Sequence, residues 1–202
     1  DSAGNLLPHF ITVRNGDGAY GEIVADGNEQ VIGARFADAN FFIQQDLQHK
    51  LPDLLPRLAT LAFQKKLGSM LDKTHRIEHT VDRLVQMLGV DAADAGTARR
   101  AASLCKADLV SHMVVEMTSL QGVMGRYYAR YSGESDAVAD AIFEHYLPRF
   151  SGDSLPGTRA GLLVGIADRL DTLAGLFAAG LAPSGTKDPF ASVGRRLDWC
   201  RR

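Results

Sequence analysis

The order of apolar and polar residues is strand-like at the start of the chain and helix-like after it. Residues 9–15 alternate between apolar and polar side chains, which is typical of a half-buried strand. Asn15-Gly16-Asp17-Gly18 favours a tight turn, and residues 20–24 can return as a second strand. From Asn28 apolar residues recur at the spacing of a helix with a wide apolar face. The pattern therefore predicts a small N-terminal β-hairpin followed by helices.

The helical pattern continues through most of the remaining chain, with breaks at proline and glycine. Asp72 is a candidate N-cap for one helix, and Gly89 is expected to end it. The stretch 104–131, LCKADLVSHMVVEMTSLQGVMGRYYARY, continues a helix that begins at Thr97 and bends near its glycines. The expected helices cover residues 28–47, 57–71, 73–88, 97–131, 136–146 and 159–175.

The composition is that of an ordinary globular protein. The chain has 202 residues, 46% of them hydrophobic and 23% charged, with a net charge of −2, so nucleic-acid binding would need a local basic patch. Cys105 and Cys200 form no CxxC pair, which favours a reducing compartment. No apolar run is long enough for a membrane span, so we expect a cytoplasmic protein. The opening Asp1 indicates a piece of a longer protein.

The first candidate site is a metal centre. His79, Asp108 and Asp168 fall on three separate predicted helices, and imidazole and carboxylate groups could converge there on a divalent ion. Their order resembles the HD-domain superfamily of phosphohydrolases, whose pattern is a His, then a His-Asp pair, then a distant Asp. Residues 76–79 resemble the first segment and residues 166–171 the last.

The chain departs from the HD pattern at Ala107, which stands where the paired His is expected and cannot bind a metal. We therefore assign no metal ligand and regard His79, Ala107, Asp108 and Asp168 as degenerate HD positions. As structural alternatives, Asp108 pairs with Lys106 or His112 or caps a neighbouring helix, Asp168 pairs with an Arg or caps a helix, and His79 is a partly buried surface histidine.

The second candidate site is an RNA-contact surface in which cations and aromatic rings alternate. It comprises Arg126, Tyr127, Tyr128, Arg130 and Tyr131. Bases stack on such rings, and guanidinium groups bind phosphates in a bidentate manner. The structural alternative is that Tyr127 and Tyr131 face the core while Arg126 and Arg130 are solvated.

Further positive charge comes from Lys106, Lys187 and the basic tail. The loop 183–189 carries Gly, Thr and Lys, but it lacks the GxxxxGK[ST] spacing and follows no strand. We interpret this loop as a structured turn and include Lys187 among the candidate RNA contacts.

Long segments resemble one family, the beta subunit of the bacterial two-subunit glycyl-tRNA synthetase. The matching segments span residues 10–191 in the family's order, and the tail 192–202 departs from the family's pattern. They read FITVRN, GNEQVIGARFADANFFIQQD, FQKKLGSMLDKTHRI, CKADLVSHMVVEMTSLQGVMGRYYARYSGE, AIFEHYLPRFSGDSLP, GIADRLDTLAGLF and SGTKDPFA.

The resemblance implies a division of labour between two subunits. The alpha subunit holds the class II catalytic core, with ATP and Mg, and the beta subunit recognises and positions tRNA. The chain is similar to the middle portion of the beta subunit, and the anticodon-binding domain is absent from it. The degenerate Ala107-Asp108 pair is then understood as an HD fold without HD chemistry.

We therefore expect a mainly α protein, an HD-domain-like helical bundle with a small N-terminal β-hairpin. The expected parts are residues 1–27, the end of a preceding β-containing domain, residues 28–191, the HD-like domain, and residues 192–202, a divergent basic tail. The expected function is binding and positioning of tRNA(Gly) for ATP-dependent glycylation carried out with the alpha subunit. We expect no cofactor, catalytic residue or membrane contact in this segment.

The candidate RNA contacts are Arg126, Tyr127, Arg130 and Lys187. Two alternatives stay open. One is a metal-dependent HD-type phosphohydrolase that acts on nucleotides or phosphodiesters through His79, Asp108 and Asp168. The other is a purely structural module that docks on the alpha subunit without binding tRNA.

Overall fold

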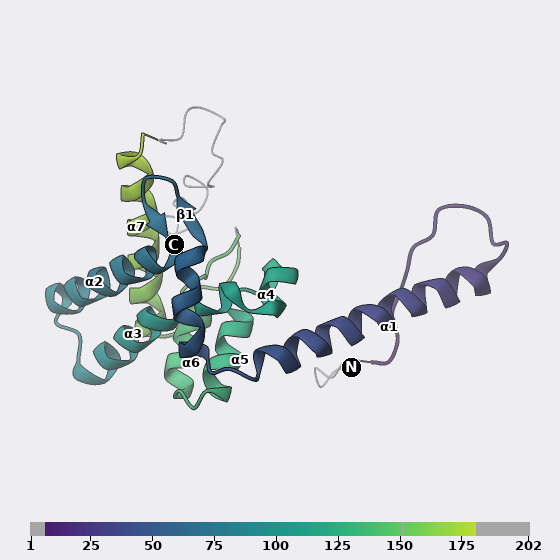
Figure 1. Cartoon of the computed structure of the whole chain (residues 1–202), viewed down its shortest axis with the longest axis horizontal. Helices are drawn as coiled ribbons and strands as arrows, with labels where there is room; N and C mark the ends of the chain where they lie inside the picture. The colour runs from purple at the N-terminus through teal and green to yellow at the C-terminus, as the bar shows by residue number, and fades with distance from the viewer. Residues whose placement is uncertain (1–6, 151, 181–202) are drawn as a thin grey trace. The chain divides into compact units, whose positions relative to one another are not determined.

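The protein is mainly α-helical, as the sequence predicts. The computed structural model describes residues 7–150 and 152–180. Within these residues it contains seven α-helices, three 3-10 helices and one two-stranded antiparallel sheet (Figure 1). The elements in chain order are α1 (Gly21–Asp46), η1 (Leu51–Thr60), β1 (Ala62–Gln64), β2 (Gly68–Ser69), α2 (Met70–Leu88), α3 (Ala92–Leu104), η2 (Ala107–Val110), α4 (His112–Glu116), η3 (Thr118–Leu120), α5 (Val123–Tyr131), α6 (Asp136–Glu144) and α7 (Arg159–Ala178).

The chain forms two compact units, Asp1–Ala39 and Asn40–Arg202. The predicted N-terminal hairpin is wrong. Residues 9–15 carry no strand, and residues 21–24 are helical. The Asp17 carboxylate accepts a hydrogen bond from the Ala19 amide (3.0 Å) and closes a local turn, after which α1 begins. A lone hairpin is marginal in water, so a long helix prevails where no second sheet supports the strands.

The observed hairpin lies later in the chain, inside the segment 57–71 that was predicted as a helix. Ala62 pairs with Ser69 and Gln64 with Gly68. The turn places Leu67 against Gly175 of α7, where a Cβ would lie 2.8 Å from the Leu67 Cδ1 atom. This distant contact, which helical periodicity cannot report, fixes the hairpin on the bundle.

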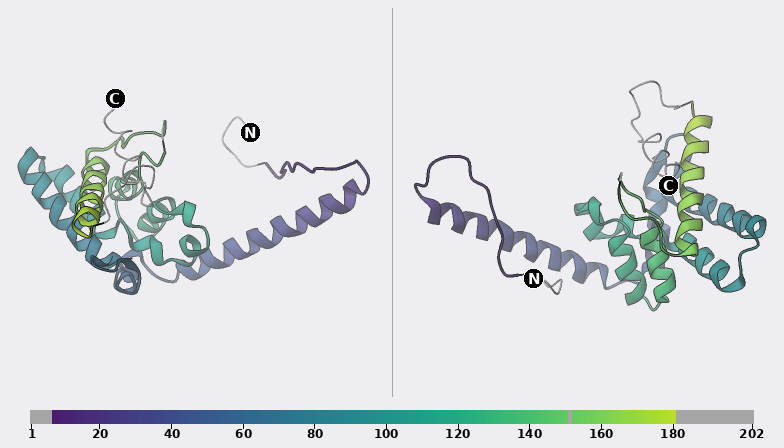
Figure 2. Two further views of the ribbon diagram at one scale, coloured as in Figure 1. Left: turned by 90° about the horizontal axis from the view of Figure 1, so that it is seen from above. Right: turned by 180° about the vertical axis from the view of Figure 1, so that it is seen from behind.

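The core lies between α2, α3, α6 and α7. Helix α7 packs against the other three, and in Figure 2 its yellow-green ribbon lies beside the blue α2 and α3. The apolar side of α2 is buried at helical spacing, through Ile77, Val81 and Val85. The predicted helices 73–88, 136–146 and 159–175 are confirmed within the usual uncertainty of helix ends. None of the described helices is long and apolar enough to cross a bilayer.

The predicted central helix 97–131 is wrong, because local hydrogen bonds divide it. Helix α3 begins earlier, where Asp91 caps its first amides, and the rest breaks into η2, α4, η3 and α5. The Asp108 carboxylate accepts hydrogen bonds from the amides of Gly122 (2.6 Å) and Gly125 (3.0 Å). Short polar side chains that bond the backbone in this way compete with helix propagation.

Gly122 provides a test of this arrangement. Its φ is +77°, and a Cβ at this position would collide with the ring of Tyr146. We expect Gly122→Ala to lower the free energy of unfolding by roughly 2–4 kcal/mol, from backbone strain together with the clash. Gly133→Ala is the matched control, because Gly133 also has a positive φ (+89°) but no atom within 4 Å of its Cβ position. Equal losses of unfolding free energy in the two variants, measured by urea denaturation, would contradict the expected collision with Tyr146.

Candidate functional site

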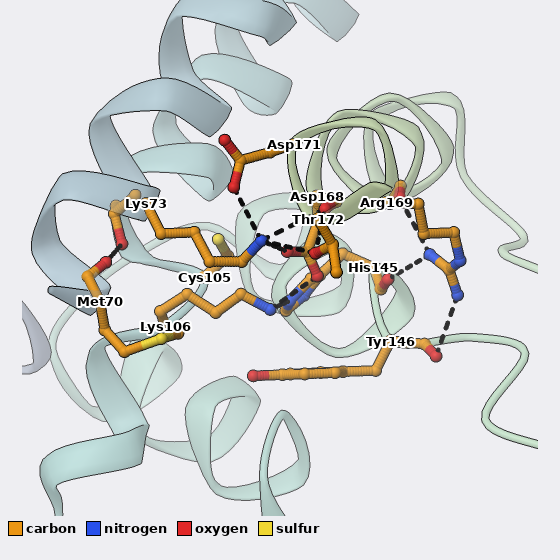
Figure 3. A network of polar contacts seen from close by, with 12 residues as sticks. Met70, Lys73, Cys105, Lys106, His145, Tyr146, Asp168, Arg169, Asp171 and Thr172 are labelled. Carbon is orange, nitrogen blue, oxygen red and sulfur yellow. Dashed lines mark hydrogen bonds and ion pairs between the residues drawn. The ribbon is translucent and has the colours of Figure 1, made fainter. Parts of the chain in front are cut away.

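A buried cluster of charged side chains joins the helices of the bundle. Lys73 comes from α2, Lys106 from the link between α3 and η2, His145 from the end of α6, and Asp168 and Asp171 from α7 (Figure 3). Lys73 and Lys106 are each 3% exposed, and His145 is fully buried. Lysine is almost never buried to this degree unless its charge is paired. We call these five residues the two-lysine centre.

Lys73 is surrounded by oxygen atoms of α7. Its Nζ lies 2.9 Å from Oδ1 of Asp168 and 3.0 Å from Oδ2 of Asp171, and it donates to Oγ1 of Thr172 at 2.7 Å. The ring of Phe63 covers the ammonium group, with its centroid 4.5 Å from Nζ. The ammonium therefore has polar partners on one side and an aromatic face on another.

Lys106 has a similar environment. Its Nζ donates to Oδ2 of Asp168 at 2.8 Å and to Nε2 of His145 at 2.8 Å, and the Tyr146 ring centroid lies 4.2 Å away. Because an ammonium group can only donate, His145 Nε2 must accept, and the proton of the imidazole sits on Nδ1. That nitrogen donates to the carbonyl of Ile142 at 2.5 Å. Asp168 thus bridges the two lysines with its two oxygens.

The charges of the centre fix its protonation states. Burial and then the nearby Lys106 ammonium lower the pKa of His145 well below its usual value, so the imidazole is neutral at pH 7. Burial by itself raises the pKa of Asp168, but Lys106 and Lys73 outweigh this effect and hold the pKa well below its usual range. Burial raises the pKa of the neighbouring Cys105 thiol to about 12, which keeps it protonated.

Arginine side chains support the centre from outside. Arg76 of α2 binds Asp171 through Nε (2.5 Å). Arg169 of α7 donates to the carbonyls of His145 (3.0 Å) and Leu147 (2.8 Å), which anchors the chain that follows α6. The backbone that carries His145 is therefore held by the same helix that supplies Asp168.

The predicted metal positions do not come together. His79 is exposed on α2, Ala107 is buried in η2, Asp108 binds the amides at the start of α5, and Asp168 belongs to the two-lysine centre. Across residues 7–150 and 152–180, no three His, Cys, Asp or Glu side chains are placed to share a metal ion. The convergence of His79, Asp108 and Asp168 that the phosphohydrolase alternative needs is therefore not found among the described residues.

The structure identifies the roles of both aspartates. Asp108 caps a neighbouring helix, as one structural alternative predicted, and burial raises its pKa to about 6. Asp168 pairs with Lys73 and Lys106 rather than with an Arg. His79 is exposed rather than partly buried.

The α5 surface, formed by Arg126, Tyr127, Arg130 and Tyr131, differs from the structural alternative, which placed the tyrosines in the core and the arginines in solvent. Tyr127 and Tyr131 are 54% and 58% exposed, one helical turn apart, whereas Tyr128 between them is buried. Arg130 binds Asp136 (2.8 Å) and Asp140 (3.0 Å). Lys187 and the loop 183–189 lie outside the described residues.

Arg126 lies beside Arg130 on the same helix. Its Nη1 is 3.8 Å from Oδ1 of Asp140, and its guanidinium carbon is 4.6 Å from the ring centroid of Phe143. The two arginines thus share one acidic partner. The tyrosines face solvent, and the arginines beside them are ordered by the acidic side of α6.

The sequence contains a signal for Lys73 that pattern reasoning missed. Lys73 precedes Ile77, Val81 and Val85 at four-residue spacing, so it lies on the buried side of α2. A cation within an apolar stripe requires a buried anion. No comparable signal identifies His145, because its role depends on the approach of Lys106 from a distant part of the chain.

The buried neutral imidazole predicts a pH dependence of stability. As the pH falls through about 6.5, an unfolded His takes up a proton that the native His145 does not, so the native state loses stability. Between pH 7.5 and 5.5 we expect wild type to lose about 1 kcal/mol relative to His145→Gln. The charged groups that act on the pKa of the ring are Lys106, Asp168 and Arg169. Urea denaturation of both proteins measures the difference, and a constant difference across this range would refute the neutral assignment.

The chain is similar in sequence to known proteins over nearly its whole length. The family described as glycyl-tRNA synthetase beta subunit matches residues 1–196. The glycine–tRNA ligase beta subunit of Synechocystis is 52% identical over 191 residues, which cover 95% of this chain and 26% of that protein. That of Clostridioides difficile is 50% identical over 188 residues, 93% of this chain and 27% of that protein. That of Moorella thermoacetica is 49% identical over 191 residues, 95% of this chain and 28% of that protein.

The chain thus spans about a quarter of the length of these curated relatives. The match extends through the bundle, the two-lysine centre and the α5 surface, all of which lie within the matched residues. The chain belongs to the glycyl-tRNA synthetase beta subunit family.

Proposed function

We propose that the chain is an HD-like helical module from the middle portion of the beta subunit, and that it binds and positions tRNA(Gly). Glycylation, with its ATP and Mg, takes place with the alpha subunit, and the module itself is not catalytic. The observation that carries the proposal is the family match over residues 1–196. The relatives are named as beta subunits of glycine–tRNA ligase, so an alpha subunit is the expected partner.

The α5 surface supplies groups suited to RNA. Tyr127 and Tyr131 expose two aromatic rings on one side of a short helix, where unpaired bases can stack. Each stacked base contributes about 1–3 kcal/mol in single-strand binding. Two exposed aromatic residues one helical turn apart form a larger apolar patch than the single apolar side chains that are common on protein surfaces, which supports their assignment as contacts.

The arginines beside them can reach phosphates in spite of their acidic partners. Arg130 and its partner Asp136 are both exposed, with side chains 39% and 83% accessible. Exposed ion pairs contribute only about 0–1 kcal/mol, so an RNA phosphate can compete for the guanidinium. Arg126 is ordered by Asp140 and the Phe143 ring. We keep Lys187 as a proposed fourth contact.

The alternatives make different demands on the structure. A metal-dependent phosphohydrolase would need three ligands at His79, Asp108 and Asp168, but Asp108 and Asp168 have separate partners and His79 is exposed. A module that only docks on the alpha subunit would bind that subunit and show no affinity for tRNA. The binding experiments below distinguish this second case from tRNA positioning.

We expect Arg126→Ala with Arg130→Ala to weaken tRNA(Gly) binding about tenfold and to reduce the salt slope of the affinity by one to two. Tyr127→Ala with Tyr131→Ala removes two stacking rings, so binding should weaken at least about 30-fold while the salt slope stays unchanged, because stacking releases no counterions. Fluorescence anisotropy with labelled tRNA(Gly) measures both.

The control for the arginine pair is Arg99→Ala with Arg159→Ala, two exposed arginines with acidic partners on other helices. Circular dichroism melting confirms that each variant is folded. If the Arg126 and Arg130 variant binds as tightly as the control, the α5 surface is not the RNA contact.

Removing the shared acidic partner should have the opposite effect. Asp140→Asn removes the acidic partner of Arg126 and leaves Arg130 with Asp136 alone, so we expect tRNA affinity to rise two- to fivefold, with a steeper salt dependence. Asp82→Asn is the matched control, because it changes the net charge equally and frees Arg99 instead. An equal rise in both variants would mean that net charge alone, and not the α5 surface, governs binding.

A further inference from the structure

The two-lysine centre brings together oxygen and nitrogen atoms of the kind that bind divalent cations in proteins. They are both carboxylate oxygens of Asp168, an oxygen of Asp171, the Nε2 of His145 and the hydroxyl of Thr172. Carboxylate, imidazole and hydroxyl groups suit zinc, manganese or magnesium. In this structure these atoms surround two ammonium groups instead, as Figure 3 shows.

We infer that Lys73 and Lys106 are the permanent cations of this centre, which therefore neither needs nor admits a divalent metal ion. The inference goes beyond tRNA positioning and does not depend on it. It concerns Asp168, a degenerate HD position that lies in this centre, and the residues around it, whose present partners do not fit a metal.

The lysines lie against these ligating atoms. Oδ1 of Asp168 forms an ion pair with Lys73 Nζ at 2.9 Å without a hydrogen bond, and Oδ2 accepts a hydrogen bond from Lys106 Nζ at 2.8 Å. The lone pair of His145 Nε2 accepts from Lys106, and Nδ1 carries its proton. These separations are hydrogen-bond lengths, longer than the roughly 2.0–2.2 Å of zinc bonds to carboxylate or imidazole. A metal would have to displace a buried ammonium group from these atoms.

The aromatic rings make the centre selective for ammonium. Phe63 lies over Lys73 and Tyr146 over Lys106, with centroids 4.5 and 4.2 Å from the Nζ atoms. A ring face attracts an ammonium group through its quadrupole. The same face offers no lone pair to complete the coordination of a divalent ion, so this side of each position favours lysine over metal.

The charge balance opposes a metal as well. In the two-lysine centre the positive charges of Lys73 and Lys106 balance the negative charges of Asp168 and Asp171, and His145 is neutral. A divalent ion would add two unbalanced positive charges to this buried site. Like charges at this depth repel strongly because water does not screen them.

The ammonium groups also join separate helices, as a structural metal ion would. Lys73 ties α2 to α7, and Lys106 ties the α3–η2 link to α7 and to the end of α6. A structural metal stabilises a small domain by joining ligands from separate elements. Here two side chains of the protein itself make the corresponding links.

The first test asks whether metal enters the wild-type centre. The chain is freed of metal with EDTA and titrated with Co²⁺, whose visible spectrum reports coordination by His and Asp. We expect no change in melting temperature with EDTA. We also expect no Co²⁺ signal that disappears in Asp168→Asn. An EDTA-sensitive melting temperature, or a stoichiometric Co²⁺ signal that Asp168→Asn removes, would overturn the inference.

The second test replaces the ammonium group. Lys106→Gly should lower the melting temperature by about 10 °C, because it leaves buried partners without their cation. Millimolar propylammonium should recover part of this loss by entering the vacated position. Lys65→Gly, which removes an exposed lysine in the β1–β2 turn, is the matched control. An equal response of both variants to propylammonium would contradict the inference.

Lys106→Met is a second variant that tests the same inference if Lys106→Gly does not fold. Methionine preserves the aliphatic stem and removes only the positive charge. We expect a loss of melting temperature close to that of the glycine variant, with no recovery by propylammonium because the position is filled. A Lys106→Met protein as stable as wild type would show that the ammonium group is not a structural cation. Neither test involves tRNA, so their failure leaves the binding experiments independent.

Discussion

Burial of two lysine ammonium groups is the constraint on which the bundle depends. An unpaired ammonium in the interior is strongly unfavourable, so Lys73 and Lys106 need anions that arrive only when the helices are correctly packed. Asp168 satisfies both lysines, one with each oxygen. Because the two lysines come from different elements, a shift of α7 along its axis would leave at least one ammonium group buried without its carboxylate partner. The pairing therefore selects a single packing of the helices, and not merely a compact one.

Two further buried carboxylates shape the chain between α3 and α6 by the same logic. Asp46 accepts from the amides of His112 (2.7 Å) and Met113 (3.0 Å) and from the hydroxyl of Tyr128 (2.7 Å). Asp108 accepts from amides at the start of α5. Each carboxylate has donors that a continuous helix would use internally, and the chain breaks into short helices where they bind. Irregular backbone here is thus the consequence of satisfying buried charge.

The sequence predicts those elements that are determined by a local pattern of apolar side chains. Helices such as α2 and α7 carry a full apolar stripe, and periodicity finds them. The hairpin at residues 62–69 depends on Leu67 meeting Gly175, and the breaks after α3 depend on Asp108 meeting Gly122, so neither is visible in a local pattern. The candidate site follows the same division. Asp168 is found by its motif, but its partners are lysines, which a search for metal ligands among His and Asp passes over.

The α5 surface is linked to the buried carboxylates Asp46 and Asp108. A nine-residue helix is marginal by itself, and its rotation about its own axis must be fixed from outside. Tyr128 fixes it from within the core, because its hydroxyl binds Asp46 while the neighbouring Tyr127 and, one turn on, Tyr131 turn to solvent. Asp108 holds the start of the same helix. The exposed rings therefore have a defined direction even though they lie on a short element, and a preorganised pair of rings loses less entropy on stacking with a base than a mobile pair would.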